Sequence, residues 1–383
     1  MMSRRWWLVP VLCCGLGALG ESPAQAMAED GWVDVKRDFK AVGDGVADDT
    51  RAVQDAMTYA EANGKPVRIP PGVYLVGPIS LGNPATQAVR SPSGQSSSVT
   101  RIQGAGRGYV CILKAKPGAY HGEQYVLTRR NVAGVHYSDF CISGNGVAYG
   151  GLDFSFNYDV AGAPSSTNVL ENVWIEGCTK IGANLDGFHD SKVSGLLIRG
   201  IGGFDNAPVG LSFRGPGGLM MISDTIVESG VVRTSAQNGE FDRCGFFNGL
   251  EVTDGGYNHI NFNACHFYTN PRTGISLDST SVGNATCALQ LNGCYFNGGG
   301  KFYIAGQFHA GAEFNNCMFY SPGRAFFGPI AAAEGRGQVP FFVFRFCTFN
   351  GTDPVATTPV TTARVKAEYC HQPTGISELR KNW

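Results

Sequence analysis

The segment "NACHFY", residues 263–268, carries the pattern that decides the fold. A cysteine stands two residues before a phenylalanine, and an asparagine lies just upstream. The same arrangement, with or without the asparagine, recurs in "DRCGFF" (242–247), "NGCYFN" (292–297), "NNCMFY" (315–320) and "RFCTFN" (345–350). Repetition of one short pattern along the chain indicates that a structural unit is being built several times.

The apolar residue that ends each pattern serves as a register mark. The marks are Ile175, Ile198, Ile226, Phe246, Phe267, Phe296, Phe319 and Phe349. Their spacing of roughly 20–30 residues is typical of a solenoid. Leucine is sparse at these positions, which argues against leucine-rich repeats. Short segments rich in Val, Ile and Phe, punctuated by Gly and Asn, favour strands, so we expect an all-β parallel β-helix.

The β-helix explains why these residue types recur. Equivalent residues of successive coils stack about 4.8 Å apart, and side chains alternate between core and surface. In "CHF" we therefore expect Cys265 and Phe267 to point inward and His266 to point outward. Cysteine is then a small apolar filler, and phenylalanine stacks on phenylalanine. The recurring Asn263, Asn292 and Asn315 suit turn positions at which an amide bonds to its counterpart in the next coil.

The chain has 12 cysteines, and the same stacking predicts that most of the core ones are free thiols. Parallel neighbours hold their Cβ atoms near the strand spacing of about 4.8 Å, beyond the about 3.8 Å that a disulfide prefers. No CxxC or His-x-His cluster is present, so no metal site is predicted. The sequence predicts no cofactor; Ca²⁺ is left open, although no motif for it is present.

Composition and the first residues bear on partners and location. The net charge of −1 gives no reason to expect nucleic acid as a partner. Arg4 and Arg5 precede an apolar stretch that ends in "SPAQA", which predicts a signal peptide over residues 1–26, resembling a twin-arginine signal. The stretch is too short to span a bilayer, so no membrane insertion is expected. We expect an exported, periplasmic or extracellular monomer with one β-helix domain over 27–383.

The N-terminal stretch "VDVKRDFKAVGDGVADDTRAVQDAMTYAEANGKPVRIPPGVYLV" (33–76) predicts a helix and carries a family resemblance. Asp49 is placed as the N-cap of a helix over about residues 50–61. Its apolar stripe is Ala52, Val53, Ala56, Met57 and Ala60. The stretch resembles the opening of the pectate lyase-like superfamily, which includes rhamnogalacturonase- and epimerase-like proteins and family 28 glycoside hydrolases. The resemblance implies a right-handed, single-stranded parallel β-helix whose open end is covered by a capping helix, and secreted carbohydrate chemistry.

The catalytic motifs of family 28 hydrolases do not carry over. "NLDG" (184–187) resembles the first of them, with Leu185 in place of threonine, but no Gly-His-Gly is present. The fold alone does not define the function, so the site is sought among the residues of the coils.

Alternation in the strand that follows each repeat predicts a column of charged side chains. Apolar residues are expected to point inward at Leu185, Leu211, Phe213, Leu250, Val252, Ile275 and Leu277. The outward residues are then Asp186, Arg214, Glu251 and Asp278, which we predict as catalytic, with Arg233 between them. Adjacent coils would bring Glu251 within about 5 Å of Asp278, the separation of a retaining carboxylate pair. A solvated surface is the alternative interpretation of this column.

Further polar residues are candidates for substrate binding. They are His189 in "GFHDSK" (187–192), Arg233, Asp254, Tyr257 and His259. Glu251 with Asp278 would suit hydrolysis, whereas Arg214 and Arg233 with Tyr257 and His259 would suit β-elimination on a uronate. The sequence thus predicts a secreted enzyme, a polysaccharide lyase or glycoside hydrolase, that acts on an acidic glycan. The alternative is a non-catalytic protein of glycan binding or exopolysaccharide assembly, in which Trp174, Tyr268, Tyr295 and Tyr320 stack on sugar rings.

Overall fold

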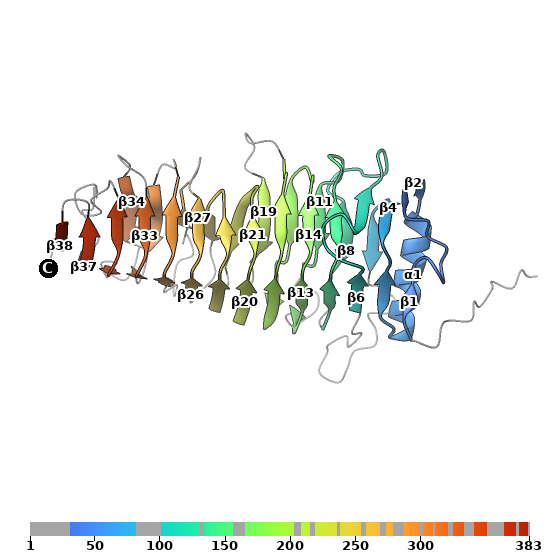
Figure 1. Ribbon diagram of the computed structural model, residues 1–383, viewed down its shortest axis with the longest axis horizontal. Coiled ribbons are helices and arrows are strands. Elements are labelled where there is room, and N and C mark those ends of the chain that lie inside the picture. The colour runs from blue at the N-terminus through green and yellow to red at the C-terminus, as the bar shows by residue number, and fades with distance from the viewer. Residues whose placement is uncertain are drawn as a thin grey trace, which may run out of the picture.

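The computed structural model shows a parallel β-helix that runs as a single rod from the N-terminal helix to the last strands (Figure 1). The structure describes residues 31–81, 101–130, 134–155, 165–202, 208–214, 219–235, 238–253, 258–268, 273–278, 287–298, 302–308, 311–320, 325–332, 341–350, 364–372 and 375–381. The predicted signal peptide, residues 1–26, and the candidates Asp254 and Tyr257 lie outside these ranges. The fold class predicted from the repeat is confirmed.

The strands form three faces, here named A, B and C, and a typical coil contributes one strand to each. Face A consists of β1 (Val33–Asp34), β3 (Val67–Ile69), β6 (Arg101–Gly104), β9 (His136–Ser138), β13 (Val169–Glu171), β17 (Ser191–Ser194), β20 (Leu219–Ser223), β23 (Asn238–Asp242), β26 (Asn258–Asn263), β29 (Cys287–Asn292), β32 (Gly311–Asn315), β35 (Phe341–Arg345) and β37 (Arg364–Gln372). Face B consists of β2 (Asp44–Asp48), β4 (Gly72–Val76), β7 (Cys111–Ala115), β10 (Cys141–Ser143), β14 (Trp174–Glu176), β18 (Leu197–Arg199), β21 (Ile226–Val227), β24 (Gly245–Phe246), β27 (His266–Tyr268), β30 (Tyr295–Asn297), β33 (Met318–Tyr320) and β36 (Thr348–Asn350). Face C consists of β5 (Ile79–Leu81), β8 (Tyr125–Arg129), β11 (Gly150–Asp153), β15 (Ile181–Asn184), β19 (Val209–Phe213), β22 (Val231–Thr234), β25 (Leu250–Thr253), β28 (Ile275–Asp278), β31 (Phe302–Phe308) and β34 (Ala325–Ala332).

Hydrogen bonding joins the faces into long sheets. Faces A and B share one 26-stranded sheet, which also contains β38 (Gly375–Lys381), and face C is a separate 10-stranded sheet. β12 (Ser165–Ser166) and β16 (Phe188–His189) form a small pair of their own. β38 runs antiparallel to β37 at the C-terminal end, whereas the pairs within the three faces are parallel. The strands of one face therefore stack coil upon coil.

The corner between faces A and B explains the repeating sequence pattern. From β9 onward one residue in the left-handed conformation, with φ between 50° and 64°, separates the two directions of the chain; these corner residues are Asp139, Asn172, Gly195, Asp224, Arg243, Ala264, Gly293, Asn316, Phe346 and Tyr369. The first residue after the corner points into the core, and so does the third. In "NACHFY", Ala264 is the corner residue, and Cys265 and Phe267 are buried.

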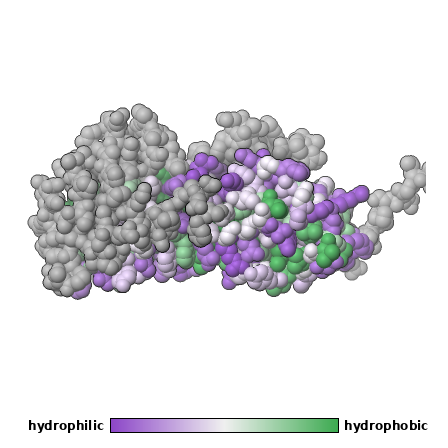
Figure 2. Space-filling model, turned by 90° about the horizontal axis from the view of Figure 1, so that it is seen from above, coloured by the Kyte–Doolittle hydropathy of each residue, from purple (hydrophilic) through white to green (hydrophobic). Residues whose placement is uncertain are grey.

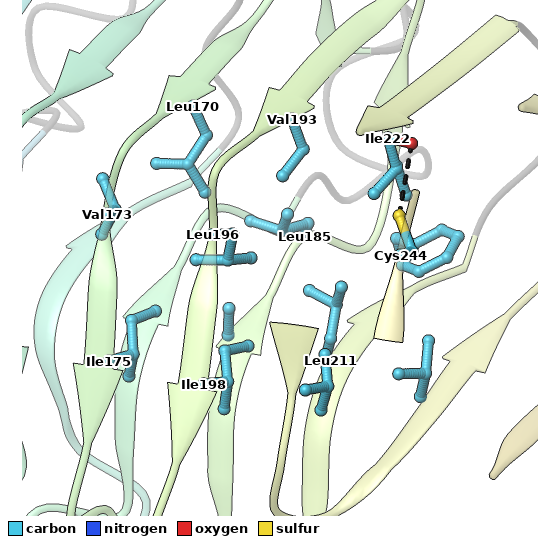
Figure 3. Packing of buried hydrophobic residues seen from close by; sticks show 14 of the residues in the cluster. Leu170, Val173, Ile175, Leu185, Val193, Leu196, Ile198, Leu211, Ile222 and Cys244 are labelled. Atoms are coloured by element: carbon cyan, nitrogen blue, oxygen red, sulfur yellow. Dashed lines mark hydrogen bonds between the residues drawn. The ribbon is translucent and has the colours of Figure 1, made fainter. Parts of the chain in front are cut away.

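The cysteines after the corners form a ladder of thiols inside the helix. Each thiol lies 3.3–3.6 Å from a carbonyl oxygen of the preceding coil. Cys244 Sγ, for example, donates to the carbonyl oxygen of Ile222 at 3.5 Å (Figure 3). Cysteine is small enough for the inside of a tight corner and supplies a weak donor there. All nine described cysteines for which burial is given are buried and free of disulfides, as the stacking predicts.

Phenylalanines stack beside the thiols. The rings of Phe267 and Phe296 are 4.7 Å apart and within 10° of parallel, and Phe296 continues onto Phe319 and then Phe349. On the other side of the corner Asn292 Nδ2 donates to Asn263 Oδ1 at 3.0 Å, and Asn315 Nδ2 donates to Asn292 Oδ1 at 3.1 Å. The predicted aromatic stack and asparagine ladder are both confirmed.

One register mark was placed wrongly by one residue. Ile226 is 41% exposed on the outside of face B, and Val227 occupies the inward position beside Ile198 and Phe246. The corner residue of this coil is Asp224, and Thr225 stands where later coils have cysteine. Without the cysteine, the sequence alone did not show where the corner lies.

Two corners carry residues that are poorly suited to their conformation. A left-handed conformation costs an L residue with a side chain roughly 1–2 kcal/mol, and Gly, Asn and Asp tolerate it best. Phe346 and Tyr369 nevertheless adopt it, with rings stacked at 5.5 Å. Such a ring pair contributes about 0.5–1.5 kcal/mol beyond area burial, which is less than the cost of two strained corners.

The helix α1 (Thr50–Asn63) covers the N-terminal end of the core (Figure 1). Its buried residues are Val53, Ala56, Met57 and Ala60, and Ala52 is partly buried, which confirms the predicted stripe. Asp49 precedes the helix but does not cap it with its side chain. The Asp49 carboxylate instead accepts hydrogen bonds from the backbone amides of Val42 and Gly43 at 2.6 and 2.9 Å, which ties the preceding turn to the helix start.

A buried polar group connects the helix to the first complete coils. Arg129 of β8 is buried, and its Nη1 lies 3.4 Å from Glu61 Oε1 of α1 and donates to the Tyr137 hydroxyl at 3.1 Å. Burial raises the pKa of Tyr137, so the phenol stays neutral and accepts this bond. The guanidinium thus links the cap to faces A and C from inside the core.

We expect the thiols to be unreactive in the folded protein. They are buried, and burial raises the pKa of Cys111, Cys141 and Cys178 to about 12, so little thiolate forms at neutral pH. A thiol reagent should modify few cysteines in the native protein and most of them after denaturation without reductant. Disulfides among Cys244, Cys265, Cys294, Cys317 and Cys347 would contradict the ladder.

Phe267→Ala should strongly destabilise the protein. The ring is fully buried between Phe246 and Phe296, so its removal leaves a cavity that costs on the order of 3–5 kcal/mol. His266→Ala is the control, because His266 is the exposed neighbour on face B and should cost less than about 1 kcal/mol. Denaturant unfolding measures both, and equal losses for the two variants would show that the inward assignment is wrong.

Candidate functional site

Face C presents an outward row of polar side chains along its strands. Register places Thr128, Asp153, Asn184, Ser212, Arg233, Glu251 and Ser276 side by side in successive coils. Their inward neighbours Leu185, Leu211, Phe213, Leu250, Val252 and Ile275 are buried, which confirms the predicted alternation. The side chain of Leu277 lies outside the described part. The candidate charges therefore face outward on one surface.

Asp186 and Arg214 form an ion pair between adjacent coils of face C. Arg214 Nη2 and Nε lie 2.8 and 3.1 Å from Asp186 Oδ2, and the Arg214 backbone amide donates to Asp186 Oδ1 at 2.8 Å. The Ser212 hydroxyl donates to the same oxygen at 2.6 Å. Asp186 thus accepts four hydrogen bonds. The half-exposed Arg214 guanidinium has five N–H donors, and two of them are used by Asp186.

A second ion pair lies two coils further on. Arg233 Nε is 2.8 Å from Glu251 Oε2, and both side chains are about one-third exposed, at 34% and 31%. We name the set Asp186, Arg214, Arg233 and Glu251 the face C charge ladder. Arg233 aligns with Ser212, so Arg214 lies two residues beyond it and the two ion pairs are diagonal neighbours on face C. This arrangement can bind an anionic group and still keep a carboxylate nearby.

A further ion pair extends the row toward the N-terminus, and the sequence analysis missed it. Arg130 lies 2.6 Å from Asp153 Oδ2 through Nη2, and Asn184 Nδ2 donates to Asp153 Oδ1 at 3.2 Å. The Asp153 side chain is fully buried, whereas Arg130 is 57% exposed. The sequence contains a signal for Asp153, because Ile142 pairs with the register mark Ile175 and is therefore its equivalent in the preceding coil. Extending the register marks upstream by one coil would have reached "GGLD" (150–153).

The predicted pairing of Glu251 with Asp278 is wrong. Register aligns Glu251 with Ser276, and Asp278 with Thr253. Both acidic residues belong to face C, but they are diagonal neighbours, about 7–8 Å apart along the backbone. Neither the strand ends nor the turns between the strands are marked in the sequence, and this allowed a register error of two residues. The direct stacking of Glu251 on Asp278, from which a retaining pair was predicted, is therefore contradicted by the register.

The predicted substrate-binding residues are spread over different elements. Arg233 belongs to the face C charge ladder, whereas His259 is exposed on face A, where it pairs with Asn238 and Ala288. His189 lies in β16 and pairs through its backbone with Ser166. The structure therefore does not bring His259 to the ladder, because the chain turns from face C to face A between β25 and β26.

The four aromatic residues of the alternative interpretation all lie on face B. Trp174, Tyr268, Tyr295 and Tyr320 belong to β14, β27, β30 and β33. Trp174 is covered in part: Arg199 lies 5.3 Å from its ring centre, and the exposed Tyr109 meets it edge-on at 6.4 Å. The visible described surface mixes hydrophilic residues with small hydrophobic patches near the N-terminal end (Figure 2).

Metal and membrane sites were also sought. Within the described ranges no group of three or more His, Cys, Asp or Glu side chains is arranged to hold a metal ion. In the same residues no helix is both long and apolar enough to cross a membrane.

Comparisons with solved structures show that the fold is shared with known proteins. The catalytic domain of Agl-KA superimposes with a TM-score of 0.58 at 15% identity over 91% of this chain and 66% of its own. The A-module of the mannuronan C-5 epimerase AlgE6 of Azotobacter vinelandii gives 0.54 at 14% identity over 89% and 99%. ORF18 of Geobacillus virus E2 gives 0.51 at 15% identity over 91%, and this chain spans 63% of its length. No curated protein sequence matches.

These likenesses show the fold, and part of the sequence is similar to a known family. Residues 32–159 match the model of the rhamnogalacturonase A/epimerase, pectate lyase-like family. The match contains the segment 33–76, on which the resemblance was recognised, and extends it through β11.

Asp186→Ala should destabilise the fold more than Arg233→Ala. Removal of the Asp186 carboxylate leaves the buried Ser212 hydroxyl and the Arg214 amide without their acceptor, at a cost of about 1–3 kcal/mol. Both partners of the Arg233–Glu251 ion pair are about one-third exposed, so this pair should contribute less than about 1 kcal/mol. Urea denaturation measures both. A smaller loss for Asp186→Ala would show that its contacts do not support the fold.

Proposed function

We propose that the protein binds an acidic polysaccharide along face C and modifies it at the face C charge ladder. The observation that carries the proposal is the presence of two arginine–carboxylate ion pairs, Asp186–Arg214 and Arg233–Glu251, on neighbouring coils of face C. Coils repeat at about 4.8 Å, so successive positions along the row can meet successive parts of an extended chain. The similarity of residues 32–159 to the rhamnogalacturonase A/epimerase, pectate lyase-like family supports a carbohydrate ligand.

The ladder suits proton transfer beside a uronate carboxylate better than hydrolysis. Arg214 and Arg233 would neutralise the carboxylate of the sugar, which makes the neighbouring C–H more acidic. Glu251 would move the proton. Loss of a leaving group would then give β-elimination, and delivery of a proton to the opposite face of the same carbon would give epimerisation. Hydrolysis needs an acid and a second carboxylate at a set separation, and the described residues do not show such a pair.

The alternative function is glycan binding without catalysis, and one observation favours it. Asp186 already accepts four hydrogen bonds, and Glu251 is paired with Arg233, so the ladder resembles a closed set of ion pairs. In this alternative the protein would hold or assemble an exported polysaccharide. Both functions would operate after export, as residues 1–26 lead us to propose, in the periplasm or outside the cell.

A panel of polysaccharides separates these functions. Polymannuronate, polygalacturonate and a neutral glucan would be incubated with the protein. Absorbance of unsaturated uronates reports elimination, reducing ends without that absorbance report hydrolysis, and proton NMR reports epimerisation. Binding without any product supports the alternative. The proposal would be contradicted if no acidic polymer bound to the protein and none gave a product.

Two variants test the ladder on the substrate so found. Glu251→Gln keeps the shape but removes the carboxylate, and turnover should fall by a factor of about 10² or more. Arg214→Ala should weaken binding of the acidic polymer and make it less sensitive to salt. The matched control is Arg243→Ala, because Arg243 is similarly exposed and pairs with Asp224 at the corner between faces A and B. Full activity of both ladder variants would place the site elsewhere.

A further inference from the structure

The corners at the C-terminal end carry a feature that the face C charge ladder does not explain. Phe346 and Tyr369 are consecutive corner residues, and the Phe346 amide donates to the Glu368 carbonyl at 3.0 Å. Their rings lie within 12° of parallel, and the residues are 61% and 62% exposed. Two large aromatic side chains are thus displayed to solvent from a backbone conformation that disfavours them.

The other corners show what this position ordinarily requires. Gly195 and Gly293 have no side chain, and Asn172 and Asn316 are amides, which tolerate the conformation. Arg243 has a side chain that is ion-paired with Asp224 at 2.8 Å. Phe346 and Tyr369 bury little of their own surface. Strain of this kind points to a function outside the fold itself.

The surroundings of the ring pair are polar and balanced in charge. On the face A side, Arg345 lies 3.2 Å from both Glu313 and Glu368, and Lys366 also contacts Glu368. These groups offer hydrogen-bond donors and acceptors beside the rings without a net charge. Sugars combine an apolar ring face with a rim of hydroxyl groups, so this surface matches their chemistry.

We propose that Phe346 and Tyr369 form a carbohydrate-binding platform on which pyranose rings stack, with Arg345 and Glu368 binding hydroxyl groups. The proposal rests on the proposed polysaccharide function for the class of ligand, but it assigns a second site on another part of the rod. Aromatic side chains bury at most roughly 150–250 Å² each. Two of them fall well short of the about 800 Å² per partner of a stable protein interface, which favours a sugar over a second copy of the chain.

The platform differs from the ladder in its expected response to salt. The ladder would bind through charge and should weaken as ionic strength rises, whereas stacking on neutral surroundings should not. The platform would hold a long chain at one end of the rod while the ladder acts on it elsewhere. The turnover of short oligosaccharides, which contact the ladder but not the platform, should not change when the platform is altered.

The test uses the full-length protein with Phe346→Asn/Tyr369→Asn, which installs a residue type already present at the Asn316 corner. The melting temperature should rise by roughly 2–4 °C, because strain is relieved. Retention of the protein on immobilised polymannuronate, polygalacturonate or neutral glucan should fall about tenfold or more, at low and at high salt. Ala264→Asn is the matched control; it changes another corner in the same way and should leave retention unchanged.

The outcomes separate this proposal from the proposed function. Lost retention in the double variant, with turnover of short oligosaccharides intact, supports the platform. Unchanged retention overturns it, while loss of binding in Arg214→Ala alone would leave the ladder standing. No retention of the unaltered protein on any of the three polymers also overturns the platform. Sedimentation velocity completes the test, because a dimer that the double variant dissociates would make these rings a contact between copies and overturn it.

Discussion

One left-handed residue per coil governs this molecule. Because Asp139, Ala264 and their equivalents turn the chain between faces A and B in one step, the residue that follows must enter the core. Alternation then determines every side chain of the adjoining strands, since a slip of one residue would exchange core and surface. The inside of this corner is narrow, and cysteine fits it while its thiol donates to the coil before. Thiol, phenylalanine and asparagine ladders are consequences of that single bend.

The bend restricts the inside of the rod far more than the outside. Inward positions accept Val, Ile, Phe or Cys, but outward positions have to satisfy only solvent or a ligand. Face C uses this freedom for charges such as Arg233 and Glu251, and face B uses it for aromatic residues such as Tyr295 and Tyr320. Each coil supplies few residues to a site, so any site must extend over several coils. A long polymer is the kind of ligand that such a surface can meet.

The inward positions could be predicted from the sequence, whereas several outward positions could not. The repeat predicted the β-helix, the buried thiols, the stack through Phe267 and the helix that covers the end, because the corner marks the register in the chain itself. It failed at Ile226, where threonine replaces cysteine at the corner. It failed again at Asp278, since turns from face B to face C vary in length: Val227 is followed by a strand at Val231, but Arg199 only by one at Val209. No residue type marks the register of the strand that follows such a turn. Asp153 was missed because the register marks were not extended by one coil toward the N-terminus.

The corner residues between faces A and B are neither purely inward nor purely outward positions. Their backbone is constrained by the fold, yet their side chains point away from it, so the residue chosen reflects both demands. Where only the fold acts, glycine or asparagine is favoured, as at Gly293 and Asn316. Arg243 departs from that choice and is compensated by its bond to Asp224. Phe346 and Tyr369 depart from it, and within the described chain their side chains are compensated only by each other's rings. A strained, exposed residue is therefore best understood through what it contacts outside the protein, whereas a strained residue with an ion pair is explained within it.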